Sequence, residues 1–243
     1  ETTDEEAELE VAALYGAVTD SVYWEISDEG VLTISGSGSI PDYSVSQQIP
    51  WFDYREYVGS IVVEEGITGI GSMAFYCCTY AETAHIASTV TYIGTGAFRE
   101  TYYLRSVTGM DNVVSFGGFV FEHSGLTSFT FPASTRTIGE YPFYETGSLT
   151  QIGIPAGVTS IDYGIGYSAY ALQRIDVDPA NPYYTSADGV LFDKGMTTLI
   201  AYPSAKADTV YSIPSSVSVI MPDAFRCQSY LIGINIPSSV TTI

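Results

Sequence analysis

The sequence predicts a β-dominated, right-handed solenoid of short repeats, and three observations indicate that fold class. First, five apolar residues recur at steps of 23, 23, 22 and 23 residues: Ile70, Ile93, Phe116, Ile138 and Ile161. Second, a ring stands five residues after each of the first four, and a leucine follows downstream: Phe75, Phe98, Phe121, Phe143, Leu104, Leu126, Leu149 and Leu172. Third, each leucine precedes a short strand-like segment. Such a period, with one strand and one turn segment, is typical of a leucine-rich-repeat solenoid.

The N-terminal part of the chain divides into a leader and a cap. Residues 1–19 are predicted to be an acidic leader of the frayed or disordered kind. Residues 20–58 are predicted to form a β cap, because the alternating runs 23–26 and 31–34 flank a glycine-containing turn, as in a β-hairpin. A solenoid needs such a cap, since its first coil would otherwise expose its core to water.

Residues 59–243 are predicted to form the solenoid, with repeats of 22–23 residues. Burying the five apolar side chains of one repeat yields roughly 8–15 kcal/mol, whereas ordering its backbone costs about 1–2 kcal/mol per residue, so a repeat needs neighbours. We expect the repeat strands to stack as one parallel sheet, with short turn or 3-10 segments between them. The expected strands lie near 61–63, 84–86, 107–109, 129–131, 152–154, 175–177, 211–213 and 234–236.

Two irregularities interrupt the repeat. In the coil after Ile161, Gly166 replaces the expected phenylalanine, and either Ile165 or Tyr167 is predicted to fill the space. The step from Ile161 to Ile220 is 59 residues, which makes 178–212 a longer repeat. It contains the apolar runs 189–192 and 199–202 around a turn, and we expect them to form a hairpin that projects from one edge.

Composition excludes some partners and favours a location. The formal net charge is −20, with 28 acidic against 8 basic residues, so the surface repels phosphate backbones and we expect no nucleic-acid partner. No apolar run approaches a membrane-spanning length, and the acidic start is not a signal peptide. The pattern is typical of a mature exported protein or of a trimmed fragment. Because the sequence stops within a repeat, we expect further repeats or an anchor beyond it.

The amino-acid sequences of the repeats are specific enough to suggest a family. The segments that carry the resemblance are 32–38, 41–43, 50–51, 70–78, 154–161, 187–192, 199–203, 213–217 and 236–243. Together they resemble the BspA-like (TpLRR-type) class of bacterial leucine-rich repeats over about residues 20–243. The resemblance implies a secreted or cell-surface bacterial protein, and several such proteins are adhesins that bind host or bacterial surface proteins. It implies no catalytic motif.

The sequence offers little for catalysis, and we expect a non-enzyme without a cofactor or metal. His85 falls at an outward strand position and His123 in a turn, and we interpret both as solvated surface residues. Asp176 and Asp178 share one strand face, but no calcium-binding loop follows them. Cys78, like the small residues at the same position in other repeats, is predicted to be a buried side chain in a tight turn.

The candidate binding surface is the row of side chains that face outward from the predicted strands. Its members are Thr83, His85, Ser106, Thr108, Ser128, Thr130, Gln151, Arg174, Asp176 and Asn235. If the role of this row is purely structural, it is a strand face adapted to close stacking; if the role is functional, it is a docking surface. Many of the 20 tyrosines fall in the turn segments, where packing between coils and ligand contact are equally plausible.

These features leave three functions open. The first is a surface module that binds a host or bacterial protein and serves adhesion. The second is a carbohydrate-binding module that uses exposed tyrosine and tryptophan rings. The third is a spacer that displays another domain. The sequence favours the first.

Overall fold

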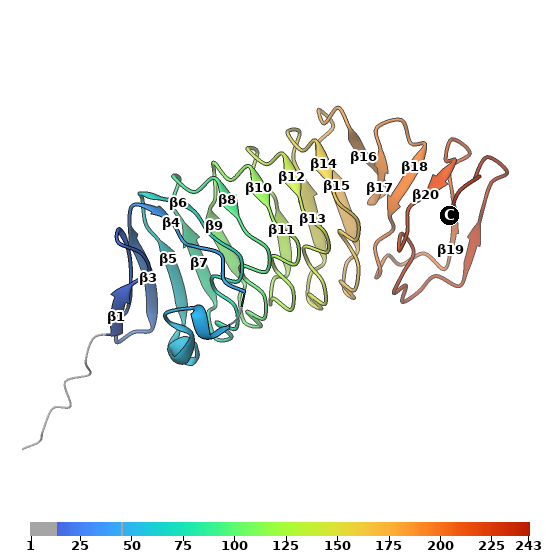
Figure 1. Ribbon diagram of the computed structural model, residues 1–243. Coiled ribbons are helices and arrows are strands. Elements are labelled where there is room, and N and C mark those ends of the chain that lie inside the picture. Colours follow the sequence, from blue (N-terminus) through green and yellow to red (C-terminus); the bar gives the residue numbers. More distant parts are fainter. Residues whose placement is uncertain (1–13, 45) are drawn as a thin grey trace, which may run out of the picture.

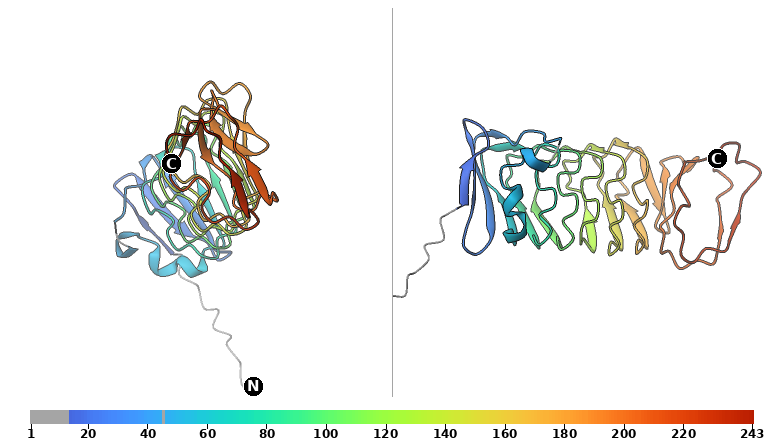
Figure 2. Two further views of the ribbon diagram at one scale, coloured as in Figure 1. Left: turned by 90° about the vertical axis from the view of Figure 1, so that its right-hand side faces the viewer. Right: turned by 60° about the horizontal axis from the view of Figure 1, so that its bottom comes forward.

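In the computed structural model, which describes residues 14–44 and 46–243, the chain winds into a β-solenoid whose coils stack along one axis (Figure 1). Seen along that axis, the coils lie one behind another (Figure 2, left). Each regular coil contributes one longer strand to a first edge, a two- or three-residue strand to a second edge, and a turn segment to a third side. The predicted fold class is therefore confirmed.

The N-terminal cap continues the solenoid's first sheet. Its elements are β1 (Leu14–Ala17), β2 (Val22–Ile26), β3 (Val31–Gly36), β4 (Gly38–Ser39) and the 3-10 helices η1 (Ser46–Gln48) and η2 (Phe52–Tyr57). β2 and β3 form the predicted antiparallel hairpin, and β3 then pairs in parallel with the first repeat strand. β1 lies within residues 1–19, the predicted leader, and there Leu14 pairs with Ile26 and packs on the core. Residues 1–13 lie outside the described residues.

The first edge carries a strand at each of the eight predicted positions. They are β5 (Ser60–Val63), β7 (Thr83–Ile86), β9 (Ser106–Gly109), β11 (Ser128–Thr130), β13 (Gln151–Ile154), β15 (Arg174–Val177), β19 (Val210–Ser212) and β21 (Gly233–Asn235). Every pairing among them is parallel. The prediction of one continuous sheet is wrong, however. The strands belong to three sheets, which end after β9, after β15 and at β21.

Each break in the first edge has a local cause. The 22-residue step shortens the chain between Phe121 and Leu126, just before β11, so β11 does not reach the hydrogen-bonding register of β9. There the Arg105 guanidinium donates to the Gly125 carbonyl at 3.0 Å. At the second break, the Ile175 amide donates to Gly189 at 2.9 Å instead of to a parallel repeat strand.

The second edge is formed by short parallel strands. They are β6 (Ile67–Gly69), β8 (Tyr92–Ile93), β10 (Ser115–Phe116), β12 (Thr137–Ile138), β14 (Ser160–Ile161), β18 (Thr198–Ala201) and β20 (Val219–Ile220). β8, β10, β12 and β14 pair in one sheet, and an isolated bridge joins Ile70 to Ile93. At this edge Ile70, Ile93, Phe116, Ile138 and Ile220 are buried in the core, and Ile161 packs against it half-buried.

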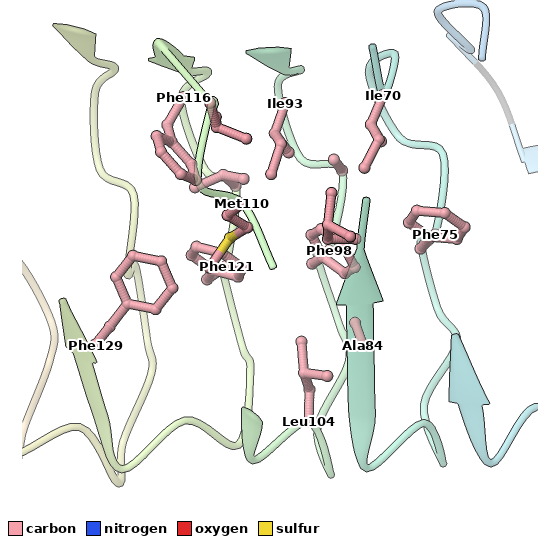
Figure 3. Packing of buried hydrophobic residues seen from close by; sticks show 14 of the residues in the cluster. Ile70, Phe75, Ala84, Ile93, Phe98, Leu104, Met110, Phe116, Phe121 and Phe129 are labelled. Atoms are coloured by element: carbon pink, nitrogen blue, oxygen red, sulfur yellow. The ribbon is translucent and has the colours of Figure 1, made fainter. Parts of the chain in front are cut away.

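The core is organised around a column of aromatic rings. Phe75, Phe98, Phe121 and Phe143 are at most 1% exposed, and successive ring centroids lie 5.1, 5.7 and 5.8 Å apart. Figure 3 shows the first three of these rings in a row. The buried Trp51 of the cap extends the column, with its ring 5.9 Å from that of Phe75. Offset aromatic pairs contribute about 0.5–1.5 kcal/mol beyond the area they bury. Further along, Ile165 fills the space at Gly166 and is 1% exposed, so one of the two predicted substitutes is confirmed.

The longer repeat is part of the stack and does not project from it. β16 (Tyr184–Ala187) and β17 (Val190–Asp193) form an antiparallel hairpin, β17 also pairs antiparallel with β18, and β18 rejoins the second edge beside β20. Val190, Leu191 and Phe192 are all fully buried, which corrects the expectation of a projecting hairpin. Exposing three consecutive large apolar side chains to water would forgo the free energy gained by burying them, so the strand packs into the core.

Candidate functional site

The candidate binding surface is the row of outward side chains along the first edge, which we call the outward ladder. It comprises Ser60, Val62, Thr83, His85, Ser106, Thr108, Ser128, Thr130, Gln151, Gly153, Arg174, Asp176, Ser212, Gly233 and Asn235. Parallel pairing sets equivalent residues of neighbouring coils side by side, for example Ser128, Gln151 and Arg174. With strands about 4.8 Å apart, this alignment produces a ribbon of closely spaced polar groups.

The ten residues predicted from the sequence are all exposed or half-buried, but they fall into separate stretches. The first stretch contains Thr83, His85, Ser106 and Thr108, on β7 and β9. The second contains Ser128, Thr130, Gln151, Arg174 and Asp176, on β11, β13 and β15. Asn235 lies apart, on β21 in the last sheet.

Side chains of the outward ladder bond mainly to one another. His85 Nδ1 lies 3.1 Å from Thr108 Oγ1 on the next strand. Gln151 Nε2 donates to Asp176 Oδ2 at 2.8 Å, and Asn235 Nδ2 donates to Ser212 Oγ at 3.0 Å. The Arg174 guanidinium also binds Asp176 through two hydrogen bonds, of 2.7 and 2.6 Å, which raise the pKa of Arg174.

Gly153 lets two strands of the second stretch approach closely. A Cβ atom added to Gly153 would lie 2.6 Å from Thr130 Oγ1, so the close approach of β11 and β13 requires glycine there. A flat polar surface of this kind can recognise a ligand through shape and hydrogen bonds.

The residues singled out in the sequence for possible chemistry lie apart from one another in the structure. His85 and Thr108 are both exposed, and among the described residues His85 has no carboxylate partner that would orient its ring for general-base catalysis. Among the described residues, no group of three His, Cys, Asp or Glu side chains is placed to hold a metal ion. Burial raises the pKa of the Cys78 thiol to about 12, so it is protonated at neutral pH, and its side chain is buried as predicted.

The sequence analysis missed a cluster on the turn side of the solenoid. The turn-face cluster consists of Arg99, Glu100, Glu122, His123 and Glu145. Glu100, His123 and Glu145 occupy equivalent turn positions, with φ values of 60°, 55° and 54°. This shared backbone conformation brings the side chains of three coils together. The expectation that His123 is solvated is wrong, because only 27% of its side chain is exposed and Nε2 lies 3.4 Å from Glu145 Oε2.

Glu122 is the most constrained charge in the turn-face cluster. Its side chain is 6% exposed, and Arg99 Nε lies 3.1 Å from Glu122 Oε2. Burial raises the pKa of Glu122 above its usual value, because the opposing attraction of Arg99 and His123 only partly offsets the loss of solvation. Spacing alone could not reveal this pairing, because residues 99 and 122 meet only when the coils stack.

Some tyrosines of the turn segments pack half-buried between coils, and others are exposed. Tyr144 and Tyr167 are half-buried and stack with ring centroids 5.5 Å apart, and Arg226 lies 4.8 Å above the Tyr167 ring. In contrast, Tyr103 is 46% exposed and Tyr80 52%, although their rings also stack, at 5.7 Å. The tyrosines therefore contribute to coil–coil contact even where one face of the ring is open to solvent.

The fold and the flat polar ladder define a leucine-rich-repeat module. A model of the BspA-type leucine-rich-repeat region matches residues 50–179 and 204–243 in six copies. The chain belongs to this family, and the resemblance seen in its sequence is confirmed. The unmatched residues 180–203 include the hairpin of the longer repeat.

Solved structures of bacterial leucine-rich-repeat proteins share the fold. One from Eubacterium ventriosum is 42% identical, with a TM-score of 0.93 over 95% of this chain and 62% of that one. This chain therefore spans less than two thirds of that relative's length. A leucine-rich cell-surface protein from Faecalibacterium prausnitzii is 26% identical (TM-score 0.63; 93% of this chain and 72% of that one). The pneumococcal vaccine antigen PcpA is 18% identical, with a TM-score of 0.61 over 93% of this chain and 71% of that one, and supports the fold alone.

No relative was found among curated proteins. Within residues 14–44 and 46–243, no helix has the length and apolar character needed to cross a membrane.

Proposed function

We propose that this chain is a non-enzymatic binding module that acts outside a bacterial cell, where it docks a protein partner along the outward ladder. The observation that carries the proposal is the second stretch of the ladder, where five exposed or half-buried polar side chains from three hydrogen-bonded strands form one flat surface. Solenoids commonly use such extended strand faces for binding.

The chemistry of the surface favours a protein over other partners. Serine, threonine and glutamine side chains offer both donors and acceptors, which match the exposed polar groups of a protein surface. The net charge of −20 disfavours acidic partners and leaves neutral or basic ones. Location outside the cell is supported by family membership and by the relative from Faecalibacterium prausnitzii, which is itself named a cell-surface protein. Adhesion is the role that fits a surface module of this kind.

The test is binding of the chain to a panel of purified extracellular-matrix and bacterial surface proteins, followed by variants against each binder. Thr130→Lys and Gln151→Lys should each weaken binding, because a long charged side chain breaks the flat surface. Thr137→Lys is the matched control, since Thr137 is an exposed strand threonine on the second edge. Circular dichroism checks that all three variants fold. Equal affinity of Thr130→Lys, Gln151→Lys and the unmodified chain would show that the ladder is not the docking surface.

A further inference from the structure

A hollow opens where the outward ladder is interrupted by the longer repeat. In the described part of the chain, β15 ends its sheet without a parallel neighbour on its far side, and the first edge resumes at β19. Between them lies an open cavity of about 600 Å³, within the range of about 300–1,000 Å³ that is usual for small-molecule sites. Side chains from four segments line it: Gln173, Arg174 and Asp176 from β15 and the residue before it, Ser186 and Asp188 from the hairpin, Lys206, and Tyr230.

Two ion pairs fix the charges around the hollow. Arg174 is held by Asp176 through its two hydrogen bonds, so its planar fork is already occupied. Lys206, whose side chain is 11% exposed, donates to Asp188 Oδ2 at 2.7 Å and lies 3.1 Å from Asp208 Oδ2. Burial alone would lower the pKa of Lys206, but the hydrogen bonds to Asp188 and Asp208 outweigh burial and raise it.

This arrangement disfavours a charged ligand of either sign. An anionic ligand would compete with Asp176 for Arg174 and with Asp188 for Lys206, and it would approach a chain of net charge −20. A cationic ligand would meet Arg174 and Lys206, whose charges offset those of Asp176 and Asp188 in the same lining. The ligand that keeps every ion pair intact is neutral and satisfies the remaining donors and acceptors.

Those remaining groups have the chemistry that sugar hydroxyls need. Arg174 retains N–H donors beyond the two it gives to Asp176, and Asp188, with 86% of its side chain exposed, retains acceptor capacity. Gln173 supplies an amide with both donors and acceptors. Tyr230, 55% exposed, adds an aromatic face with a polar tip, suited to a ligand that is apolar on one side and hydroxylated at its edge.

We propose that this hollow binds the end of a neutral oligosaccharide. Its hydroxyls hydrogen-bond to Arg174, Asp188 and Gln173, and one face of a sugar ring packs on Tyr230. The site goes beyond the protein-docking function proposed above, because it shares only Arg174 and Asp176 with the second stretch and adds residues of the longer repeat and Tyr230. The binding is reversible and involves no covalent step.

The experiment screens the chain on an array of neutral and acidic oligosaccharides and titrates the neutral binders by calorimetry. Tyr230→Ala is the test variant, and Tyr103→Ala is the matched control, because Tyr103 is a similarly exposed tyrosine at the equivalent position of another coil, outside the hollow. Loss of the aromatic platform should raise Kd about tenfold, whereas the control should change it by about twofold or less. Gln173→Ala should also weaken binding, since it removes hydrogen bonds without touching either ion pair.

Three results would overturn the proposal. The first is that no neutral oligosaccharide binds at millimolar concentration. The second is that acidic oligosaccharides bind more tightly than neutral ones. The third is that Tyr230→Ala leaves the Kd of a neutral oligosaccharide unchanged. If Tyr230→Ala weakens binding of a protein partner while no sugar binds, the hollow is a protein anchor and the sugar proposal is wrong.

Discussion

The first edge and the turn side of this solenoid respond differently to the same irregularities in the repeat. Along the first edge, the strand ladder breaks after β9 and again after β15. On the turn side, contacts pass from coil to coil through both regions. Arg99 lies 5.9 Å above the Tyr76 ring and pairs with Glu122, and further along Tyr144 stacks on Tyr167. Arg226 continues the series onto Tyr167 although 59 residues of chain separate the two.

The difference shows where this fold accommodates inserted residues. The extra residues of the longer repeat enter the first and second edges, where a hairpin can pair with its own strands. The turn segments before and after the insertion still meet, as the 3.7 Å approach of Ser168 Oγ and Cys227 Sγ indicates. The turn side therefore keeps the stack in register, and the first edge, which carries the outward ladder, is free to vary.

Phe143→Ala should have the largest effect on stability. The ring is 1% exposed and packs against both Phe121 and Phe131, so its loss leaves a cavity between coils and should cost about 3–5 kcal/mol. Tyr103→Ala, on the exposed turn side, should cost much less. Chemical denaturation of both variants measures the difference. Equal losses would mean that the turn-side tyrosines carry as much of the stack as the core column.

Phe192→Ala tests whether the longer repeat is a structural part of the stack. Phe192 is fully buried among Val190, Leu199 and Tyr202, so we expect a loss of about 3 kcal/mol, toward the lower end of the range for a core phenylalanine. Tyr183→Ala, in the same repeat but 53% exposed, is the control and should be nearly neutral. A negligible loss for Phe192→Ala would restore the idea of a projecting, dispensable hairpin.

Glu122→Gln should change how stability depends on pH. Because burial raises the pKa of Glu122 in the folded state, the folded protein holds a proton more tightly than the unfolded one above the usual pKa of 4.5. The contribution of Glu122 to stability is therefore fully present below pH 4.5 and is lost as pH rises through the folded pKa. The glutamine variant lacks this contribution at every pH.

The measurement is Tm against pH for the two proteins. The advantage of the unmodified protein over Glu122→Gln should shrink as pH rises from 4.5, even if the unpaired Arg99 lowers the Tm of the variant throughout. A difference that grows with pH would show that attraction by Arg99 and His123 outweighs the burial of Glu122.

Thr130→Lys should have the smallest effect on stability. The residue is exposed on a strand, and surface substitutions of this kind usually change stability by within about 0.5 kcal/mol. Thermal denaturation beside the Thr137→Lys control measures the change. A loss as large as that of a core variant would mean that outward residues hold the strands together, so binding defects in ladder variants would then report misfolding.

Much of the fold could be predicted from the sequence because each buried position recurs in several successive repeats. The ring five residues after each isoleucine or phenylalanine, and the small residue at Cys78 and its equivalents, could be assigned from spacing alone. The outward positions followed from strand alternation once the inward residues were known. The resemblance to the BspA-like class added the family.

What could not be predicted depends on contacts between coils. A single missing residue before Leu126 breaks the first-edge sheet, although it hardly alters the periodicity. The pairing of Arg99 with Glu122 and the hollow beside Arg174 arise only when segments distant in sequence stack. The hairpin was misplaced because its pattern of alternation does not tell whether Val190, Leu191 and Phe192 face solvent or a neighbouring coil.

The central claim is that binding belongs to the first edge and stacking to the turn side. The most direct test places the same new charge on each side, as Thr130→Lys on the first edge and Tyr103→Lys on the turn side. Surface plasmon resonance then measures the Kd of both folded variants for a protein partner identified in the panel. We expect at least about a tenfold weakening for Thr130→Lys, or about 1.4 kcal/mol, and little change for Tyr103→Lys. Weakening by Tyr103→Lys with Thr130→Lys unaffected would contradict the claim and place the docking surface on the turn-side tyrosines.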